Sequence, residues 1–116
     1  MAVELDLRRD VRIPMLFAPL LLNKDGRALA QVADLSMHGA LLHARRGLFA
    51  RGETVSGWLQ SSAVDSDDEI VLAVALDVRW IADDHERGWS CVGCEMHPLD
   101  SRSKARLRHL IAKAAP

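Results

Sequence analysis

The sequence predicts a mainly β domain, either a sandwich or a small barrel, that ends in one helix. Apolar segments of strand length alternate with turn signals along most of the chain. Near the C-terminus the period changes, and apolar residues follow the helical i, i+3, i+4, i+7 spacing at Leu107, Leu110, Ile111 and Ala114. The length of 116 residues fits a single domain with its own core.

Three strands are predicted in the first half of the chain, over residues 11–22, 27–33 and 39–44. Pro14 and Pro19 interrupt the first segment, which therefore fits an edge or bent strand better than a long helix. Residues 23–26, Asn-Lys-Asp-Gly, are a turn signal before the second strand. Residues 34–38 are predicted to form a loop before the third.

Three further strands are predicted in the second half, over residues 53–60, 70–80 and 89–97. The polar, acidic residues 61–69 are expected to form a solvated loop, and residues 83–88 a hairpin connection. Trp58 and Trp89 are expected to pack in the core or against the helix. Asp100 or Ser101 can cap the helix.

Charge and composition narrow the class of partner. The formal net charge is −1, whereas proteins that bind nucleic-acid polymers usually carry an excess of basic residues. Positive charge is instead local, in Arg8, Arg9 and Arg12, and a local cluster on a nearly neutral chain favours a small anion. No apolar segment has the length needed to insert through a membrane, and residues 1–10 lack the apolar segment of a signal peptide. The expected location is therefore the cytoplasm.

The first candidate functional motif is R-x-x-x-R at residues 8–12, where Arg9 adds a third arginine to Arg8 and Arg12. Taken alone, such a motif is more often a solubilising charged arm than a binding site. Here it leads directly into the first predicted strand, so it can fold over the domain. Planar guanidinium groups match phosphate oxygens and the O6/N7 edge of guanine.

The second candidate motif is D-x-S-x-x-G, formed by Asp34, Ser36 and Gly39. One interpretation is an ordinary turn between strands, in which Asp and Ser side chains bond to nearby backbone N–H groups. The other is a ligand site in which the carboxylate accepts from amino and imino groups. Glycine would then permit a close backbone approach or an unusual dihedral. Together the two motifs predict a site for an anion that also has hydrogen-bonding edges.

These motifs, in this order and followed by Trp80 and a C-terminal amphipathic segment, resemble the PilZ domain, the bacterial receptor domain for the second messenger cyclic di-GMP. The resemblance covers nearly the whole chain, and residues 92–96 also resemble the family's glycine-containing last strand. It implies a six-stranded antiparallel β-barrel with a C-terminal helix over residues 11–116. A flexible arm, residues 1–10, would carry the start of the arginine motif.

The resemblance also implies a role for each candidate residue. Arg8 and Arg12 would contact the phosphates and bases of cyclic di-GMP, with Arg9 as a helper. Asp34 would accept from guanine N–H donors, and Ser36 would bond a phosphate or hold the loop. Trp80 is expected either to stack on a guanine, a contact worth about 1–3 kcal/mol, or to fill the core.

Cys91, Cys94 and His97 form a C-x-x-C-x-x-H pattern. A structural zinc site needs a second pair of ligands, which is missing here. Positions three apart on a strand point to opposite faces, and this geometry opposes both shared ligation and a disulfide. No pairing of a nucleophile with a base stands out either. We therefore predict no metal, no cofactor and no catalytic residue.

The resulting hypothesis is a stand-alone receptor that binds cyclic di-GMP, changes conformation and signals to a partner protein in trans. The alternative from another class is a PilZ-like adaptor that acts through protein contacts without ligand. That alternative predicts degraded motifs, whereas this chain keeps both. A third reading is a small enzyme or metal protein built around Cys91, Cys94 and His97.

Overall fold

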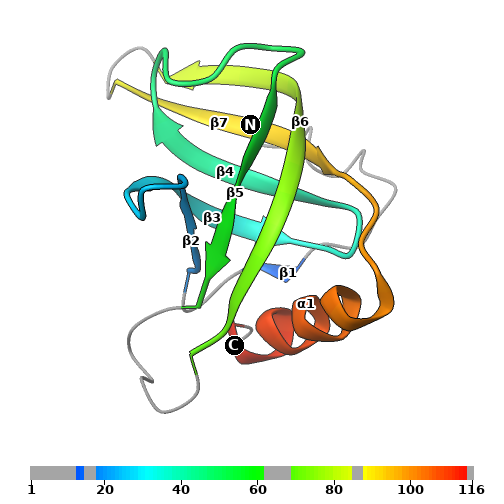
Figure 1. The fold of residues 1–116 in the computed structure, drawn as a ribbon. Coiled ribbons are helices and arrows are strands. Elements are labelled where there is room, and N and C mark those ends of the chain that lie inside the picture. Colours follow the sequence, from blue (N-terminus) through cyan, green and yellow to red (C-terminus); the bar gives the residue numbers. More distant parts are fainter. Residues whose placement is uncertain (1–12, 15–17, 62–68, 85–87, 115–116) are drawn as a thin grey trace.

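The structure is a computed structural model that describes residues 13–14, 18–61, 69–84 and 88–114. These residues form seven strands and one helix (Figure 1). The elements are β1 Ile13–Pro14, β2 Leu20–Leu22, β3 Ala28–Leu35, β4 Gly39–Arg45, β5 Thr54–Gln60, β6 Val71–Asp84, β7 Trp89–Met96 and α1 Ser101–Ala114.

Six of these strands close into an antiparallel barrel, which confirms the predicted fold class. Each strand pairs with the next in the order β3–β2–β5–β6–β7–β4, and β4 pairs back with β3. The very short β1 and β2 pair with successive parts of β3: Leu20 lies opposite Gln31, and Pro14 lies opposite Asp34. The first predicted strand is thus two short strands that share a neighbour.

Alternating side chains of the barrel strands fill the core, as the period of a β-strand requires. Large strand side chains that are completely or almost completely buried are Leu21, Val32, Leu35, Leu42, Leu59, Leu76, Val78 and Val92. Helix α1 lies below the barrel in Figure 1, beside the start of β6. Its Leu107 and Leu110 are fully buried in the same core. The helix therefore completes the core of the barrel.

Two residues that the sequence predicts to mark a turn and a helix start, Asn23 and Asp100, make the corresponding hydrogen bonds. The side-chain Oδ1 of Asn23 accepts from the backbone N–H groups of Asp25 and Arg27, both at 2.9 Å, and closes the turn between β2 and β3. At the start of α1, Asp100 accepts from the N–H of Ser103 at 2.8 Å. This hydrogen bond lowers the pKa of Asp100, so the cap is ionised at neutral pH.

Strands β3 and β6 continue two or more residues beyond their predicted ends. Strand β3 extends to Leu35, so Asp34 belongs to the strand and not to the loop predicted over residues 34–38. Strand β6 extends to Asp84, so Trp80 lies inside a strand and not at its end. In both cases pairing with a neighbouring strand extends the element, which propensity along the chain does not reveal.

Replacing Leu107 with alanine should destabilise the protein by about 2–5 kcal/mol, because it leaves a cavity where α1 meets the barrel. Denaturant unfolding followed by circular dichroism measures the loss. Leu48→Ala is the matched control, because Leu48 is 43% exposed and its removal leaves no cavity. Equal stability of Leu107→Ala and the wild type would show that the helix does not depend on this contact.

Candidate ligand-binding site

Two β-bulges decide which polar side chains reach the outer face of the barrel. Along β3, Val32 faces the core, so strict alternation would also turn Asp34 inward. A register shift between Val32 and Asp34 inserts one residue and places Asp34 on the side of the sheet away from the core, where it is still buried, with 8% of the residue exposed. Strand β6 repeats this device, because a shift after the buried Val78 turns Trp80 outward.

The two bulges also place these residues in one row across four strands. Asp34 pairs with Leu41, Leu41 pairs with Gly93, and Gly93 pairs with Trp80. Residues that lie directly opposite one another on antiparallel strands point to the same face. With neighbouring strands about 4.8 Å apart, Asp34 and Trp80 are separated by about 14 Å across the outer face. The row thus has a buried carboxylate at one end and a partly exposed indole at the other.

Trp80 lies directly over Gly93. A Cβ atom at position 93 would be 2.2 Å from both Cε2 and Nε1 of the indole, and 2.6 Å from Cζ2. Only glycine leaves the space that the ring occupies. The sheet therefore supports the indole, while 39% of the residue remains exposed. The core-filling alternative for Trp80 is wrong, and its position suits a flat ligand.

The D-x-S-x-x-G motif forms the tight connection between β3 and β4. The N–H of Ser36 donates to the carbonyl of Gly39 at 2.9 Å, and the Ser36 hydroxyl accepts from the N–H of His38 at 3.2 Å. The buried Ser36 therefore holds the loop, which is one of the two roles expected for it. Gly39 is not among the four described glycines with positive φ, so an unusual dihedral does not explain the glycine.

All three arginines of the N-terminal motif, Arg8, Arg9 and Arg12, lie outside the described residues. The described part of the chain begins with Ile13 of β1, the residue directly after Arg12. Ile13 pairs with Leu35, and Pro14 pairs with Asp34. The strand that follows the arginine motif therefore runs beside the D-x-S-x-x-G motif.

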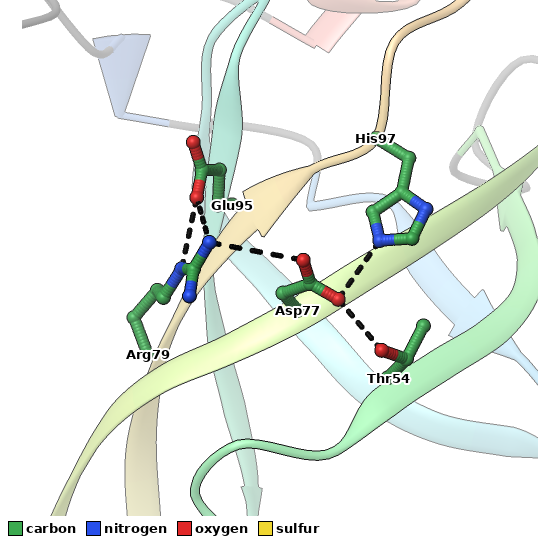
Figure 2. A network of polar contacts seen from close by, with 5 residues as sticks. All are labelled: Thr54, Asp77, Arg79, Glu95 and His97. Carbon is green, nitrogen blue, oxygen red and sulfur yellow. Dashed lines mark hydrogen bonds and ion pairs between the residues drawn. The ribbon is translucent and has the colours of Figure 1, made fainter.

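A charged pair close to Trp80 in the sequence and the fold, Arg79 with Glu95, belongs to neither of the two sequence motifs. Arg79, at the bulge of β6, donates to Glu95 of β7 through Nε at 2.8 Å and also through Nη2 (Figure 2). These hydrogen bonds raise the pKa of Arg79 further. The only sequence signal for this pair is the position of Arg79 before Trp80. The pairing itself depends on the register of β6 against β7.

Asp77 connects this pair to the segment that follows β7. Its Oδ1 accepts from the Thr54 hydroxyl at 2.7 Å and lies 2.8 Å from Nε2 of His97, while its Oδ2 lies 3.8 Å from Nη2 of Arg79 (Figure 2). The hydrogen bond from Thr54, followed by that with His97, lowers the pKa of Asp77. Asp77 is therefore a carboxylate at neutral pH and keeps two partners besides Arg79.

Cys91, Cys94 and His97 do not converge on a common point. Cys91 is exposed and Cys94 is buried, so the two thiols lie on opposite faces of β7, as the strand period predicts. His97 pairs with Asp77 instead. Within the part of the chain that the structure describes, no group of three or more His, Cys, Asp or Glu side chains is placed to hold a metal ion.

The expectation that Trp58 and Trp89 pack in the core or against the helix is wrong. Both are exposed, because their neighbours Leu59 and Ser90 take the inward positions of the strands. Trp89 stacks on His43, with ring centroids 4.9 Å apart and an angle of 21° between the planes. This pair borders a hollow of about 450 Å³ that is also lined by Leu20, Ala28, Leu29, Ala30 and Gln31.

Comparison with protein families gives a match to the PilZ domain over residues 6–113, which is most of the chain. The chain belongs to the PilZ domain family. The resemblance seen in the sequence is thereby confirmed. A comparison with curated proteins gives no match.

Solved structures share the PilZ fold at low sequence identity. The PilZ domain of Escherichia coli YcgR with c-di-GMP has a TM-score of 0.65 at 13% identity, over 93% of this chain and 91% of that one. Bacillus subtilis MotI/DgrA, an inhibitor of motility, has 0.66 at 17%, over 91% and 50%. Apo MrkH of K. pneumonia has 0.62 at 16%, over 92% and 51%. The chain thus spans about half the length of MotI/DgrA and MrkH.

The solved structures agree with this chain in fold. Their identities are too low to transfer a site residue by residue. Helix α1, in the described part of the chain, is neither long nor apolar enough to cross a membrane.

Gly93→Ala should displace the Trp80 indole, because the new Cβ would occupy the space of the ring. We expect a destabilisation of about 1–3 kcal/mol, as for other overpacked sites. In a Trp58→Phe, Trp89→Phe background, acrylamide quenching of the remaining Trp80 fluorescence should increase. Cys91→Ala, at an exposed position of the same strand, is the control. Unchanged quenching in Gly93→Ala would mean that the indole does not rest on position 93.

Proposed function

We propose that this PilZ domain is a receptor for cyclic di-GMP and not an enzyme. The observation that carries the proposal is the row in which two bulges bring Asp34 and Trp80 to the same outer face. The carboxylate can accept from guanine N–H groups, and the indole offers a face for base stacking. Structures of YcgR and of K. pneumonia MrkH with c-di-GMP support the same ligand for this chain.

The arginine motif supplies the positive charge that this ligand requires. Arg12 directly precedes β1, and β1 pairs with Asp34, so the motif connects to the barrel at the carboxylate end of the row. We assign Arg8 and Arg12 to the phosphates and bases, with Arg9 as a helper. The ligand would then extend from this end toward Trp80. The net charge of −1 fits a small dianion better than a nucleic-acid polymer.

The proposal includes a conformational change and a partner. On binding, the arginine motif folds over the ligand, and part of the binding free energy is used to order it. The new surface formed by this segment and the ligand is then recognised by a second protein in trans. The proposed compartment is the cytoplasm, where Cys91 and Cys94 stay reduced.

Calorimetric titration with cyclic di-GMP tests the receptor and its site. The wild type should bind at micromolar ligand. Trp80→Ala should lose about 1–3 kcal/mol from lost stacking. Arg12→Ala and Asp34→Ala should each lose about 1.5–3 kcal/mol from lost charge-assisted hydrogen bonds. Trp58→Ala is the control, because Trp58 is an exposed tryptophan outside the row.

Different results would contradict the receptor proposal and the assignment of its site residues. Absence of heat with the wild type would contradict the receptor. Wild-type affinity in all three site variants would contradict the assignment of the site and leave the receptor standing.

Capture of a partner tests the signalling part. The wild-type domain, immobilised, should retain a protein from the lysate of its own cells only when cyclic di-GMP is present, because the recognised surface forms on binding. Asp34→Ala should retain it in neither condition, since it binds the ligand weakly. Equal retention with and without the ligand, by both proteins, would support the ligand-independent adaptor instead.

A further inference from the structure

We infer that Arg79 is a ligand-contacting residue of the same site, which donates to an acceptor atom of the nucleotide whose base stacks on Trp80. The inference rests on the proposed function, because it adds a residue to that site. Arg79 belongs to neither sequence motif. Its assignment depends on the bulge of β6, on its contacts and on its exposure.

The bulge brings two consecutive side chains to one face of the barrel. In a regular strand, Arg79 and Trp80 would point to opposite faces. Here Trp80 lies over Gly93, and the Arg79 guanidinium reaches Glu95. Gly93 and Glu95 are two residues apart on β7 and therefore share the outer face, about 6.6 Å apart along the strand. The guanidinium and the indole therefore lie at neighbouring positions, Glu95 and Gly93, of one face of β7.

The guanidinium has donors and space for a ligand. Its contacts with Glu95 and Asp77 involve Nε and Nη2, and they do not use the two N–H groups of Nη1. The side chains of Arg79 and Glu95 are 59% and 58% exposed. Exposed ion pairs contribute little to stability. Glu95 can therefore hold the planar group in orientation while another edge of it serves the ligand.

The surrounding network also tolerates movement of Arg79. Asp77 is held by Thr54 at 2.7 Å and by His97 at 2.8 Å, independently of Arg79 (Figure 2). The distance between Oδ2 of Asp77 and Nη2 of Arg79 is 3.8 Å, which is longer than a hydrogen bond. If Arg79 turns toward a ligand, Asp77 keeps two partners. The shift therefore leaves no buried charge uncompensated.

Two parts of the nucleotide offer the required chemistry. A phosphate oxygen accepts a guanidinium hydrogen bond, and the O6/N7 edge of guanine accepts a pair of them. A base stacked on Trp80 would bring one of these acceptors to the side on which Arg79 lies. Both sources predict a charge-assisted hydrogen bond from Arg79, and they differ in how salt affects its contribution.

Titration of the full chain with cyclic di-GMP tests the inference. Arg79→Ala should weaken binding about ten- to hundred-fold, the range for a lost charge-assisted hydrogen bond. Arg79→Lys should recover only part of this loss, because lysine keeps the charge but not the planar fork. Arg108→Ala removes an exposed arginine from α1 and should bind like the wild type. Melting temperatures of all variants monitor the fold.

A salt series with the wild type and Arg79→Ala identifies the acceptor. If Arg79 contacts a phosphate, the variant should show a weaker dependence of affinity on ionic strength. If it contacts the guanine edge, affinity should fall with the salt dependence unchanged. Wild-type affinity in Arg79→Ala would overturn the inference alone and leave Arg79 as a structural ion pair. Absence of binding by the wild type would overturn the receptor proposal together with it.

Discussion

The two β-bulges in β3 and β6 are the constraint on which the candidate site depends. Each inserts one residue into a strand of the barrel, and each reverses the face to which the following side chain points. Without them, Asp34 and Trp80 would lie inside the barrel with Val32 and Val78. With them, both residues lie on the outer side of the sheet in one row across β3, β4, β7 and β6, where Asp34 is buried and Trp80 is partly exposed. The two irregularities in strand pairing therefore keep Asp34 and Trp80 out of the apolar core.

The barrel can support this row because other side chains fill its core. Leucine and valine side chains from the strands, together with Leu107 and Leu110 of α1, form one continuous core. The backbone of the site residues on the strands is consequently held by the pairing of four neighbouring strands. The arginine motif is attached at one end of the row through β1. In the proposed mechanism, this segment provides the response and the strands provide the rigid surface.

Trp80 and its neighbours show how one close contact organises several others. The indole occupies the space above Gly93, and the same bulge brings Arg79 to Glu95 two residues further along β7. An aromatic ring and a planar cation thereby lie on the same face of the barrel, a combination suited to a flat ligand with acceptor edges. Asp77, held by Thr54 and His97, continues the network away from the site. These residues come from β5, β6 and β7, together with His97, which follows β7.

The sequence alone determined the number and order of the main barrel strands, the amphipathic helix, the Asn23 turn, the Asp100 cap and the two motifs. These features follow from periodicity and local hydrogen bonding, which depend on nearby residues. Only the tertiary structure decided that Asp34 and Trp80 share an outer face, that Trp58 and Trp89 are exposed, and that Arg79 meets Glu95. The side of the sheet to which a residue after a bulge points depends on the register with a partner strand. The alternation of residues along one strand does not reveal that register.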